Sequence, residues 1–490
     1  MNIRPISEWT LYKHRFLIAY SGLAVLAALL LGLYANILPP GLSAPEQQSA
    51  ITSHALSLTE LPTAQQVVNL PFHALQKFSM NWLGLSPFGV RLPSLVFAAI
   101  TIFCLSFIIK RWFKVNVAIV ATMIIVTSTW FLSIARLGTP DIMIPFWTSV
   151  LILCATYVSQ QTKRWHLWKA LFGLSAALAL YTPYMSYLFL ATLIAAMAQP
   201  HLRYLIRQSS KVGLTIGIFF FALLMVPLCW GIYKDPSLIR EIFAIPATIP
   251  EPVQFGRDLL QAISNLGWPF NVQSGPVVTP LVGLATLVLV GIGGMRLLGD
   301  FHSVRAYVLL IWMALLIPII GFNPSNLTVL FVPVMLVMTI GLNLVVRYWY
   351  RLFPFNPYAR IFGLVPLFFL IFSIMQFNYQ RYTYTMLYSP EAGKIFNTDA
   401  FLAQKEADAL PANSPLTIVA KPADQGLYKV IADRRPNTAI IAGEQEPTRP
   451  GVYIVAEDEV VKIAPRLTVT TSKLLVNDRK EDSLRFRFYQ

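Results

Sequence analysis

Charged residues are scarce in this sequence. Only 12 % of its 490 residues are Asp, Glu, Lys or Arg, whereas 56 % are hydrophobic, and the mean hydropathy is +0.59. An ordinary soluble domain carries roughly a quarter charged residues, so the composition excludes a soluble enzyme. Intrinsic disorder is also excluded, because disordered chains combine low hydrophobicity with high net charge.

Cysteines and short catalytic motifs are scarce too. The three cysteines, Cys104, Cys154 and Cys229, all fall within apolar runs. The sequence therefore offers neither a disulfide framework nor a thiolate metal site. It contains no Walker A, GxGxxG, HExxH, GxSxG or CxxC pattern. What remains for chemistry is a small set of acids and bases close to the predicted membrane surface.

Apolar runs, in contrast, are abundant, and eleven can cross roughly 30 Å of hydrocarbon. They lie near residues 16–37, 91–110, 116–134, 140–158, 166–181, 184–199, 212–233, 277–299, 304–321, 327–346 and 360–378. The first run is longer than the apolar region of a signal peptide and lacks a small-residue cleavage site, so it predicts a retained helix. We expect a polytopic α-helical membrane protein with about 11 transmembrane helices.

The basic residues indicate how these spans are oriented. With the N-terminus in the cytoplasm, 17 of the Lys and Arg residues before position 380 fall in cytoplasmic loops and six fall in outer loops. The positive-inside rule favours this orientation. The net charge of +15 therefore reports topology, and nucleic acid is not an expected partner. Two outer loops are long, 38–90 and 234–276, and the apolar spacing in 63–83 and 256–266 predicts amphipathic helices.

The chain changes character after residue 380. The last 110 residues hold 15 Lys and Arg and 14 Asp and Glu, and an odd number of spans places them outside the cytoplasm. We expect a transmembrane domain over 1–380 and a small extracytoplasmic α/β domain over 381–490, with a helix near 398–409. Its predicted strands are 416–421, 427–432, 438–442, 452–456, 467–476 and 483–489.

Glu46, just after the first span, is the first candidate for catalysis. A carboxylate at the membrane surface can deprotonate an acceptor hydroxyl or bind a metal. The spacing Ser43-x-x-Glu46 also fits a capping box, in which Glu46 only starts a helix.

Asp141, where an outer loop returns to the membrane, is the second candidate. Thr139 and Pro140 before it are typical of a helix start, which alone would explain an acid in the first turn. A carboxylate so close to lipid is costly without a partner, however, and Arg136, Arg91 or a cation shared with Glu46 would supply one.

Other outer residues are candidates for binding. Arg91 matches the geometry of a phosphate, although it would also anchor a helix end among lipid headgroups. His54 and His73 are either metal ligands or interfacial packing residues. Tyrosines around an outer turn, Tyr181, Tyr184 and Tyr187, are able to hydrogen-bond a sugar or phosphate, although aromatic belts place tyrosines there in any case.

Four segments together resemble landmarks of the GT-C membrane glycosyltransferases, whose relatives include the protein O-mannosyltransferases and the lipid A aminoarabinose transferases. The segments are PPGLSAPE (39–46), GLSPFGVRLPS (84–94), ARLGTPD (135–141) and LYTPY (180–184). Their order and spacing match across about residues 35–230. The resemblance implies a polyprenyl-phosphate-linked sugar as donor and a lipid, glycan or protein acceptor. It also implies transfer with inversion at the outer face of a bacterial plasma membrane.

The resemblance also implies roles for individual residues. Glu46 corresponds to the second acid of an Asp-Glu pair that carries the base, but Pro45 stands where the Asp is expected. Asp141 corresponds to a further acid, which implies a co-acid or a partner in a divalent metal site. Arg91 and Arg136 match basic positions, so they are expected to bind the donor phosphate together with Tyr181 and Tyr184. Asn326 occupies a position that is often basic.

Pro45 leaves the function open between two classes. Glu46 and Asp141 either line one catalytic cleft, roofed by the two long outer loops with Arg91 or Arg136 at its mouth, or each acid caps its own helix. In the second case the chain is a non-catalytic binding or assembly protein on the same scaffold. A transporter is disfavoured, because ionisable residues at mid-membrane depth are almost absent.

Overall fold

The computed structural model describes most of residues 14–489. Not described are residues 34, 36, 58–63, 161–164, 199, 201–202, 205–210, 247, 249, 268–279, 301, 325, 353–356, 390–391, 393–394, 412–413, 423, 436, 443–444, 446–450, 457–458, 460–470 and 477–483. The basic N-terminal lead with Arg4 and Lys13, and the last part of the second outer loop, therefore lie outside the described residues.

Each of the eleven predicted spans coincides with helix. The helices are α2 (Arg15–Gly32), α6 (Pro87–Trp112), α7 (Val115–Thr127) with α8 (Thr129–Ala135), η2 (Pro140–Ile142) with α9 (Met143–Ser159), α10 (Trp165–Ala179), α11 (Met185–Ala198), α13 (Lys211–Lys234), α16 (Leu284–Gly299), α17 (Val304–Phe322), η3 (Leu327–Leu330) with α18 (Phe331–Leu352), and α19 (Pro357–Tyr388). Within the described residues, six helices are long and apolar enough to cross a membrane, and three more apolar helices are shorter. The protein is thus a multi-pass helical membrane protein.

One predicted span is broken. The run 116–134 forms α7 and α8, which meet at an angle of 62°. The break is at Ser128, whose backbone is extended and whose hydroxyl caps α8 by accepting a hydrogen bond from Phe131 N at 3.2 Å. The break falls within the polar triplet Thr127-Ser128-Thr129, and Ser and Thr are favoured helix N-caps, so the sequence holds a local signal for the turn that the length of the run does not show. Beyond α8 the chain meets the first outer loop, where Gly138 is hydrogen-bonded to Glu46 and Gln76.

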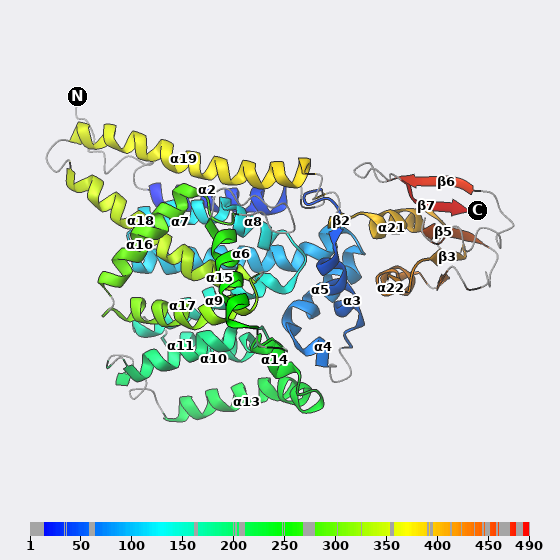
Figure 1. Cartoon of the computed structure of the whole chain (residues 1–490), viewed down its shortest axis with the longest axis horizontal. Coiled ribbons are helices and arrows are strands. Elements are labelled where there is room, and N and C mark those ends of the chain that lie inside the picture. The colour runs from blue at the N-terminus through cyan, green and yellow to red at the C-terminus, as the bar shows by residue number, and fades with distance from the viewer. Residues whose placement is uncertain are drawn as a thin grey trace.

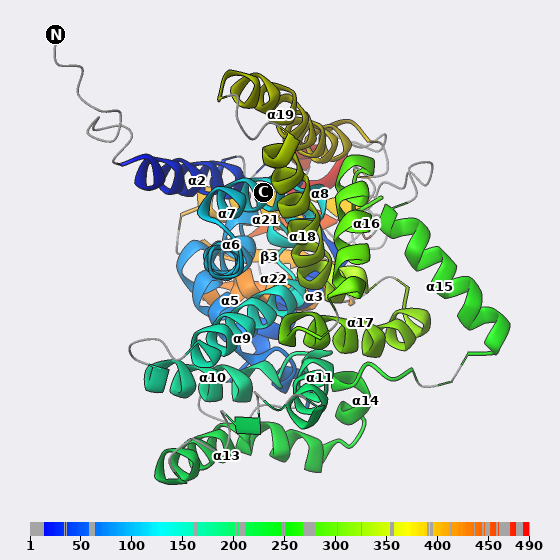
Figure 2. The same ribbon diagram turned by 90° about the vertical axis from the view of Figure 1, so that its left-hand side faces the viewer.

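The interior of the bundle is apolar and closely packed. Figures 1 and 2 show the long helices lying side by side, with α6, α9 and α18 toward the centre and α13 at one edge. Helices α16 and α18 approach most closely through Gly293 and Gly341. A Cβ on Gly293 would lie 1.9 Å from Val337 O, and one on Gly341 would lie 2.0 Å from Leu289 O. Small residues at such crossings allow helix backbones to pack tightly within a membrane.

The two outer loops form short helices at one end of the bundle. They are α3 (Ala44–Ala55), α4 (Ala64–Val67), α5 (Leu70–Leu83), α14 (Leu238–Ile242) and α15 (Pro252–Gly267). The predicted helical patterns over 63–83 and 256–266 both fall on helix. Next to them, α6 begins where Ser86 accepts a hydrogen bond from Gly89 N at 2.9 Å and Pro87 follows it, which is a favourable helix start.

The C-terminal residues form a mixed sheet with two helices. Its strands are β3 (Leu416–Val419), β4 (Thr438–Ile441), β5 (Val452–Ala456), β6 (Thr471–Val476) and β7 (Leu484–Tyr489), and its helices are α21 (Asp399–Ala409) and α22 (Gln425–Arg434). The strand order is β4-β3-β5-β7-β6. Strands β4, β3 and β5 run parallel, and β7 lies antiparallel between β5 and β6.

The strand predicted over 427–432 is wrong, because these residues lie in α22. The helix buries Leu427, Tyr428, Val430 and Ile431, a spacing that fits one face of a helix. Parallel strands such as β3 and β4 need a crossover connection, and α22 provides it.

This C-terminal unit packs against the first outer loop. Strand β2 (Phe396–Asn397) pairs antiparallel with β1 (Leu42–Ser43). Leu42, Ala50 and Met80 share one apolar cluster with Leu416 and Tyr428, and Figure 1 shows α22 beside α3. Helix α3 is therefore held between the membrane bundle and the sheet.

Candidate functional site

Glu46 and Arg91 form an ion pair in the interior. Glu46 is 0 % exposed and Arg91 is 1 % exposed. The guanidinium donates through Nε to Glu46 Oε1 at 2.8 Å and through Nη2 to Glu46 Oε2 at 3.2 Å. Its Nη1 also donates to Pro39 O at 2.8 Å. This two-pronged geometry is the strong form of an Arg–carboxylate contact, and it ties α6 to the start of α3.

The remaining capacity of the Glu46 carboxylate is also used. Its Oε2 accepts from Ser43 N at 2.8 Å and from Ser43 Oγ at 3.1 Å, and the capping box predicted from the spacing is present. Its Oε1 accepts from Gly138 N at 2.8 Å. Glu46 thus accepts five hydrogen bonds while it is fully buried. A carboxylate that is fully buried and held in this way has no path to an acceptor hydroxyl.

Arg136 is buried as well, at 3 % exposure. Its Nε donates to Leu30 O at 2.9 Å and its Nη2 to Leu33 O at 2.7 Å, both near the end of α2. Its guanidinium also lies 5.7 Å from the centre of the Tyr382 ring. Arg91 and Arg136 therefore fasten helix ends, whereas we expected one of them at the mouth of a cleft.

Asp141 has a different environment. Its side chain is exposed, and Thr139 Oγ1 donates to its Oδ2 at 3.0 Å. It lines a cavity of about 630 Å³ between η2, the turn before α11, α14 and the loop before η3, which we name the outer cavity. The lining residues include Asn69, Asp141, Thr182, Tyr184, Ser237, Arg240, Glu241 and Asn326. Glu46, Arg91, Arg136 and Tyr181 are not among them.

The wall around Tyr184 is well defined. Tyr184 has a φ of 70°, in the left-handed region, and its N–H donates to Ile242 O at 3.1 Å. Asn326 Nδ2 donates to the Tyr184 hydroxyl. Tyr181 instead turns away and donates to Leu224 O at 2.6 Å. Of the residues that we expected to bind the donor, Tyr184 alone lines the outer cavity.

Arg240 and Glu241 supply charge to the outer cavity, and the sequence did not single them out. Both lie on α14 and are exposed. Partial desolvation of the carboxyl at the cavity wall raises the pKa of Glu241, and the nearby Asp235 carboxylate raises it further. A guanidinium and two carboxylates thus face one cavity. The sequence shows only that both residues lie in a long outer loop, and this does not predict which of its side chains face a cavity.

The two candidate histidines lie apart from the outer cavity. His73 is buried, and its Nδ1 lies 2.7 Å from Ser53 Oγ; burial lowers the pKa of His73 to about 4. His54 Nε2 lies 2.6 Å from Asp433 Oδ2 on α22. In the described part of the chain, no group of three or more His, Cys, Asp or Glu is placed to hold a metal ion.

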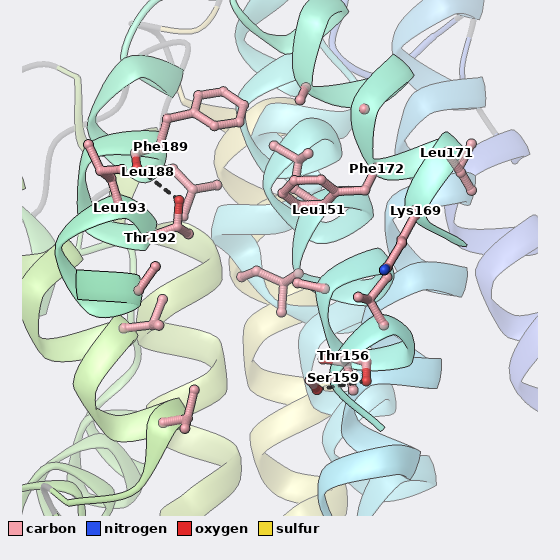
Figure 3. Close-up of a pocket in the computed structure, with 18 of the residues that line it drawn as sticks. Leu151, Thr156, Ser159, Lys169, Leu171, Phe172, Leu188, Phe189, Thr192 and Leu193 are labelled. Atoms are coloured by element: carbon pink, nitrogen blue, oxygen red, sulfur yellow. Dashed lines mark hydrogen bonds between the residues drawn. The ribbon is translucent and has the colours of Figure 1, made fainter. Parts of the chain in front are cut away.

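A large apolar groove runs alongside the outer cavity. Its volume is about 2320 Å³, and residues of α9, α10, α11, α13 and α17 line it. Figure 3 shows leucine and phenylalanine side chains along it, with Thr156, Ser159 and Lys169 at one end. The opposite end reaches Leu180, Tyr187 and Phe243, and Tyr187 Oη donates to Phe243 O at 2.8 Å. The turn at 182–187 and residues 242–244 therefore separate the groove from the outer cavity.

Comparisons with known proteins agree with this architecture. Residues 70–230 match the family model for dolichyl-phosphate-mannose-protein mannosyltransferase. No curated protein sequence matches the chain.

Two structures of ArnT from Cupriavidus metallidurans have a similar fold. The apo structure is 12 % identical and has a TM-score of 0.57, covering 96 % of this chain and 98 % of ArnT. The structure bound to undecaprenyl phosphate is 11 % identical, with a TM-score of 0.58, and covers 97 % of this chain and 98 % of ArnT. The chain therefore has the fold of ArnT, and its resemblance to the GT-C membrane glycosyltransferases related to the O-mannosyltransferases is confirmed.

Proposed function

We propose that this protein transfers a sugar from a polyprenyl-phosphate donor to an acceptor, with inversion, and that the outer cavity is its active site. The observation that carries the proposal is the combination of Asp141, Tyr184 and Arg240 in one cavity beside a long apolar groove. An acid, a hydroxyl and a guanidinium are groups that such a transfer needs, and the groove suits the tail of the donor.

We place the reaction at the outer face of a bacterial plasma membrane. In this arrangement the N-terminus is cytoplasmic and residues 381–490 are extracytoplasmic. The bent pair α7 and α8, the three shorter apolar helices and α19 then bring the six long helices to eleven spans. The support is the distribution of basic residues in the sequence, together with the outer helices and the C-terminal sheet at the same end of the bundle (Figure 1).

In the proposed reaction, Asp141 is the general base. The acceptor hydroxyl attacks the anomeric carbon of the sugar while its proton moves to the Asp141 carboxylate. The bond from that carbon to the phosphate oxygen breaks, and polyprenyl phosphate leaves with the electron pair. Arg240 stabilises the charge that develops on this phosphate. Glu46, which we expected to be the base, instead holds the chain that leads to Asp141.

The apolar groove is the proposed site for the polyprenyl tail. A polyprenyl chain is hydrocarbon, so an apolar groove can bury it without leaving polar groups of the protein unpaired. ArnT, which has this fold, has been observed with undecaprenyl phosphate bound. The turn at 182–187 separates the groove from the outer cavity, so in the proposed complex the head of the donor passes this turn to bring its phosphate to Tyr184 and Arg240.

The described residues do not fit the divalent metal site that we expected from Glu46 and Asp141. Arg91 neutralises Glu46, and Glu46 is absent from the outer cavity. The two carboxylates that do line the cavity, Asp141 and Glu241, are accompanied by no third acid or imidazole among its lining residues. No step of the proposed reaction therefore uses a metal.

The second candidate function is a non-catalytic lipid-binding or assembly protein. The observation in its favour is Pro45, near the start of α3, where its side chain can neither accept a proton nor bind a cation. Such a protein would keep the groove and the outer cavity without turnover.

Purified protein in nanodiscs separates these candidates. It is incubated with polyprenyl-phosphate-linked mannose or aminoarabinose and candidate acceptors, and the release of polyprenyl phosphate is measured. We expect release by the wild type and a loss of about 10²-fold or more in Asp141→Asn, typical for removal of a general base. Asp258→Asn is the matched control, because Asp258 is on α15 and does not line the outer cavity. Tight binding of undecaprenyl phosphate without any turnover would favour the second candidate.

A further inference from the structure

Gln76 on α5 is a fully buried polar residue to which the proposed mechanism gives no role. Its side chain is 0 % exposed. Its Nε2 donates to Val90 O at 2.9 Å and to Gly138 O at 3.0 Å. Both partners are backbone carbonyls, which only accept, so the amide nitrogen must point toward them. The orientation of the whole side-chain amide follows from this.

The oxygen of the Gln76 amide determines where two serine hydroxyl protons point and which nitrogen of a histidine carries the proton. Its Oε1 accepts from Ser49 Oγ at 2.8 Å and from Ser53 Oγ at 2.6 Å. Ser53 has one hydroxyl proton, and that proton is used for Gln76. The 2.7 Å contact between Ser53 Oγ and His73 Nδ1 therefore needs a proton on the histidine. Since burial keeps the imidazole neutral, His73 carries its single proton on Nδ1.

Gly138 connects this hydrogen-bond network to Glu46 and to the chain that leads to Asp141. Its carbonyl accepts from Gln76, and its N–H donates to Glu46 Oε1 at 2.8 Å. There is no room for a side chain, because a Cβ on Gly138 would lie 2.7 Å from Val90 Cγ1 and 2.9 Å from Val90 O. Both polar groups of one glycine are thus held by side chains from α3 and α5, three residues before Asp141.

We propose that Gln76 is a positioning residue that fixes the direction in which Asp141 enters the outer cavity. The inference rests on the proposed function for its catalytic consequence. Gln76 does not line the cavity and acts through Gly138. Residues 138–141 connect the anchored glycine to η2, so release of the Gly138 carbonyl lets the Asp141 carboxylate move. A displacement of about 1 Å at a reacting group can cost on the order of 10²-fold in rate.

The closing experiment compares Gln76→Glu and Gln76→Met with the wild type. The glutamate has the same shape but cannot donate to the two carbonyls, and the methionine fills the space without hydrogen bonds. Ser79→Ala is the matched control: Ser79 is buried one turn along α5, and its hydroxyl donates to Gly89 O at 2.5 Å instead of to Gly138.

Three measurements are made on each variant. Hydrogen exchange of the peptide that contains Gly138 is expected to accelerate at least tenfold in both Gln76 variants and to stay unchanged in the control. Turnover is expected to fall about 10²-fold in kcat, with KM for the donor within about threefold, because the donor contacts are distant. ¹⁵N spectra of His73, assigned by comparison with His73→Asn, are expected to show the Nδ1–H tautomer in the wild type. In Gln76→Met, Ser53 is free to donate to the ring, and the proton is expected on Nε2.

These outcomes are separable from the fate of the proposed function. Wild-type exchange at Gly138 in both Gln76 variants would overturn the positioning role, whatever the turnover. So would faster exchange with unchanged kcat. If the wild type has no turnover, the proposed reaction fails, and the exchange and histidine spectra still decide whether Gln76 anchors the loop.

Discussion

The ion pair between Glu46 and Arg91 leads to a prediction that separates a structural acid from a catalytic one. In Glu46→Gln, the carbonyl oxygen of the new amide can replace Oε1 and keep the contacts with Gly138 N–H and Arg91 Nε. The amide NH₂ group then occupies the Oε2 position, where Ser43 N and Arg91 Nη2 also carry protons. Two buried N–H groups therefore lose Oε2 as their acceptor, and Arg91 Nη2 keeps its other acceptor, Gly41 O.

The cost can be worked from these two donors. A buried donor left without an acceptor costs about 1–3 kcal/mol, and more when it is charged. Breaking one side of a buried ion pair costs about 3–5 kcal/mol, which agrees with the sum. We therefore expect the free energy of unfolding to fall by about 3–5 kcal/mol in both Glu46→Gln and Arg91→Met. The double variant Glu46→Leu with Arg91→Met is expected to recover only the part of this loss that comes from an unpaired charge, because Ser43 N and Gly138 N then lose their acceptor.

Reversible unfolding in mixed micelles measures these changes, and turnover is measured below the unfolding transition. A structural Glu46 predicts a large loss of stability together with residual turnover in the double variant. The reasoning is refuted if Glu46→Gln keeps wild-type stability but loses all turnover, since that is the behaviour of a catalytic base. Wild-type stability in Arg91→Met would also refute it.

Two further predictions concern α14. Arg240→Gln is expected to weaken the binding of undecaprenyl phosphate about tenfold or more, because a hydrogen bond to a charged group contributes roughly 1.5–3 kcal/mol. The control Arg257→Gln on α15 is expected to leave binding unchanged. Equal affinities of the two variants would exclude Arg240 from the phosphate site. Because the pKa of Glu241 is raised, this group loses its negative charge as the pH falls through that pKa, so undecaprenyl phosphate should bind more tightly at the acid end of a titration. Since the lipid phosphate also titrates, the prediction is the difference from Glu241→Gln, and identical titrations of the two proteins would contradict it.

Much of the fold could be predicted because its determinants are local. Apolar runs long enough for a membrane mark the spans, and the spacing from Ser43 to Glu46 identifies the start of α3. The break at Ser128 was not predicted in this way, since the length of an apolar run reports a span and not a bend within it, although the triplet Thr127-Ser128-Thr129 marks the place. The strand expected over 427–432 failed for a related reason. A short apolar run fits either a strand or one face of a helix, and the parallel pairing of β3 with β4 decides between them.

The candidate site was predicted only in part, because local sequence signals mark helix starts but not contacts between distant residues. Asp141 was identified from its helix-start neighbours, and it lines the outer cavity. The partner of Arg91 is Glu46, 45 residues earlier in the chain, and no local pattern reports such a contact. Arg240 lies in a long loop without clear periodicity. Gln76 lies on an amphipathic helix where a polar residue would ordinarily face water, and only the three-dimensional packing reveals that it faces Gly138.

The last prediction concerns Pro45, the position where the family resemblance implies an aspartate. Pro45 is exposed and lies near the N-terminus of α3. An aspartate there gains about 0.3–1 kcal/mol from the helix dipole and loses a similar amount because the unfolded chain becomes more flexible. We therefore expect Pro45→Asp to fold with unchanged stability. Pro45 does not line the outer cavity, and Asp141 is the proposed base, so kcat is expected to stay within about twofold of the wild type. Release of polyprenyl phosphate measures it, with Ala44→Asp as the control for an added charge in the same turn. A tenfold or greater gain that is specific to Pro45→Asp would show that this chain lacks an acid which the reaction uses, and the assignment of Asp141 as the sole base would then fail.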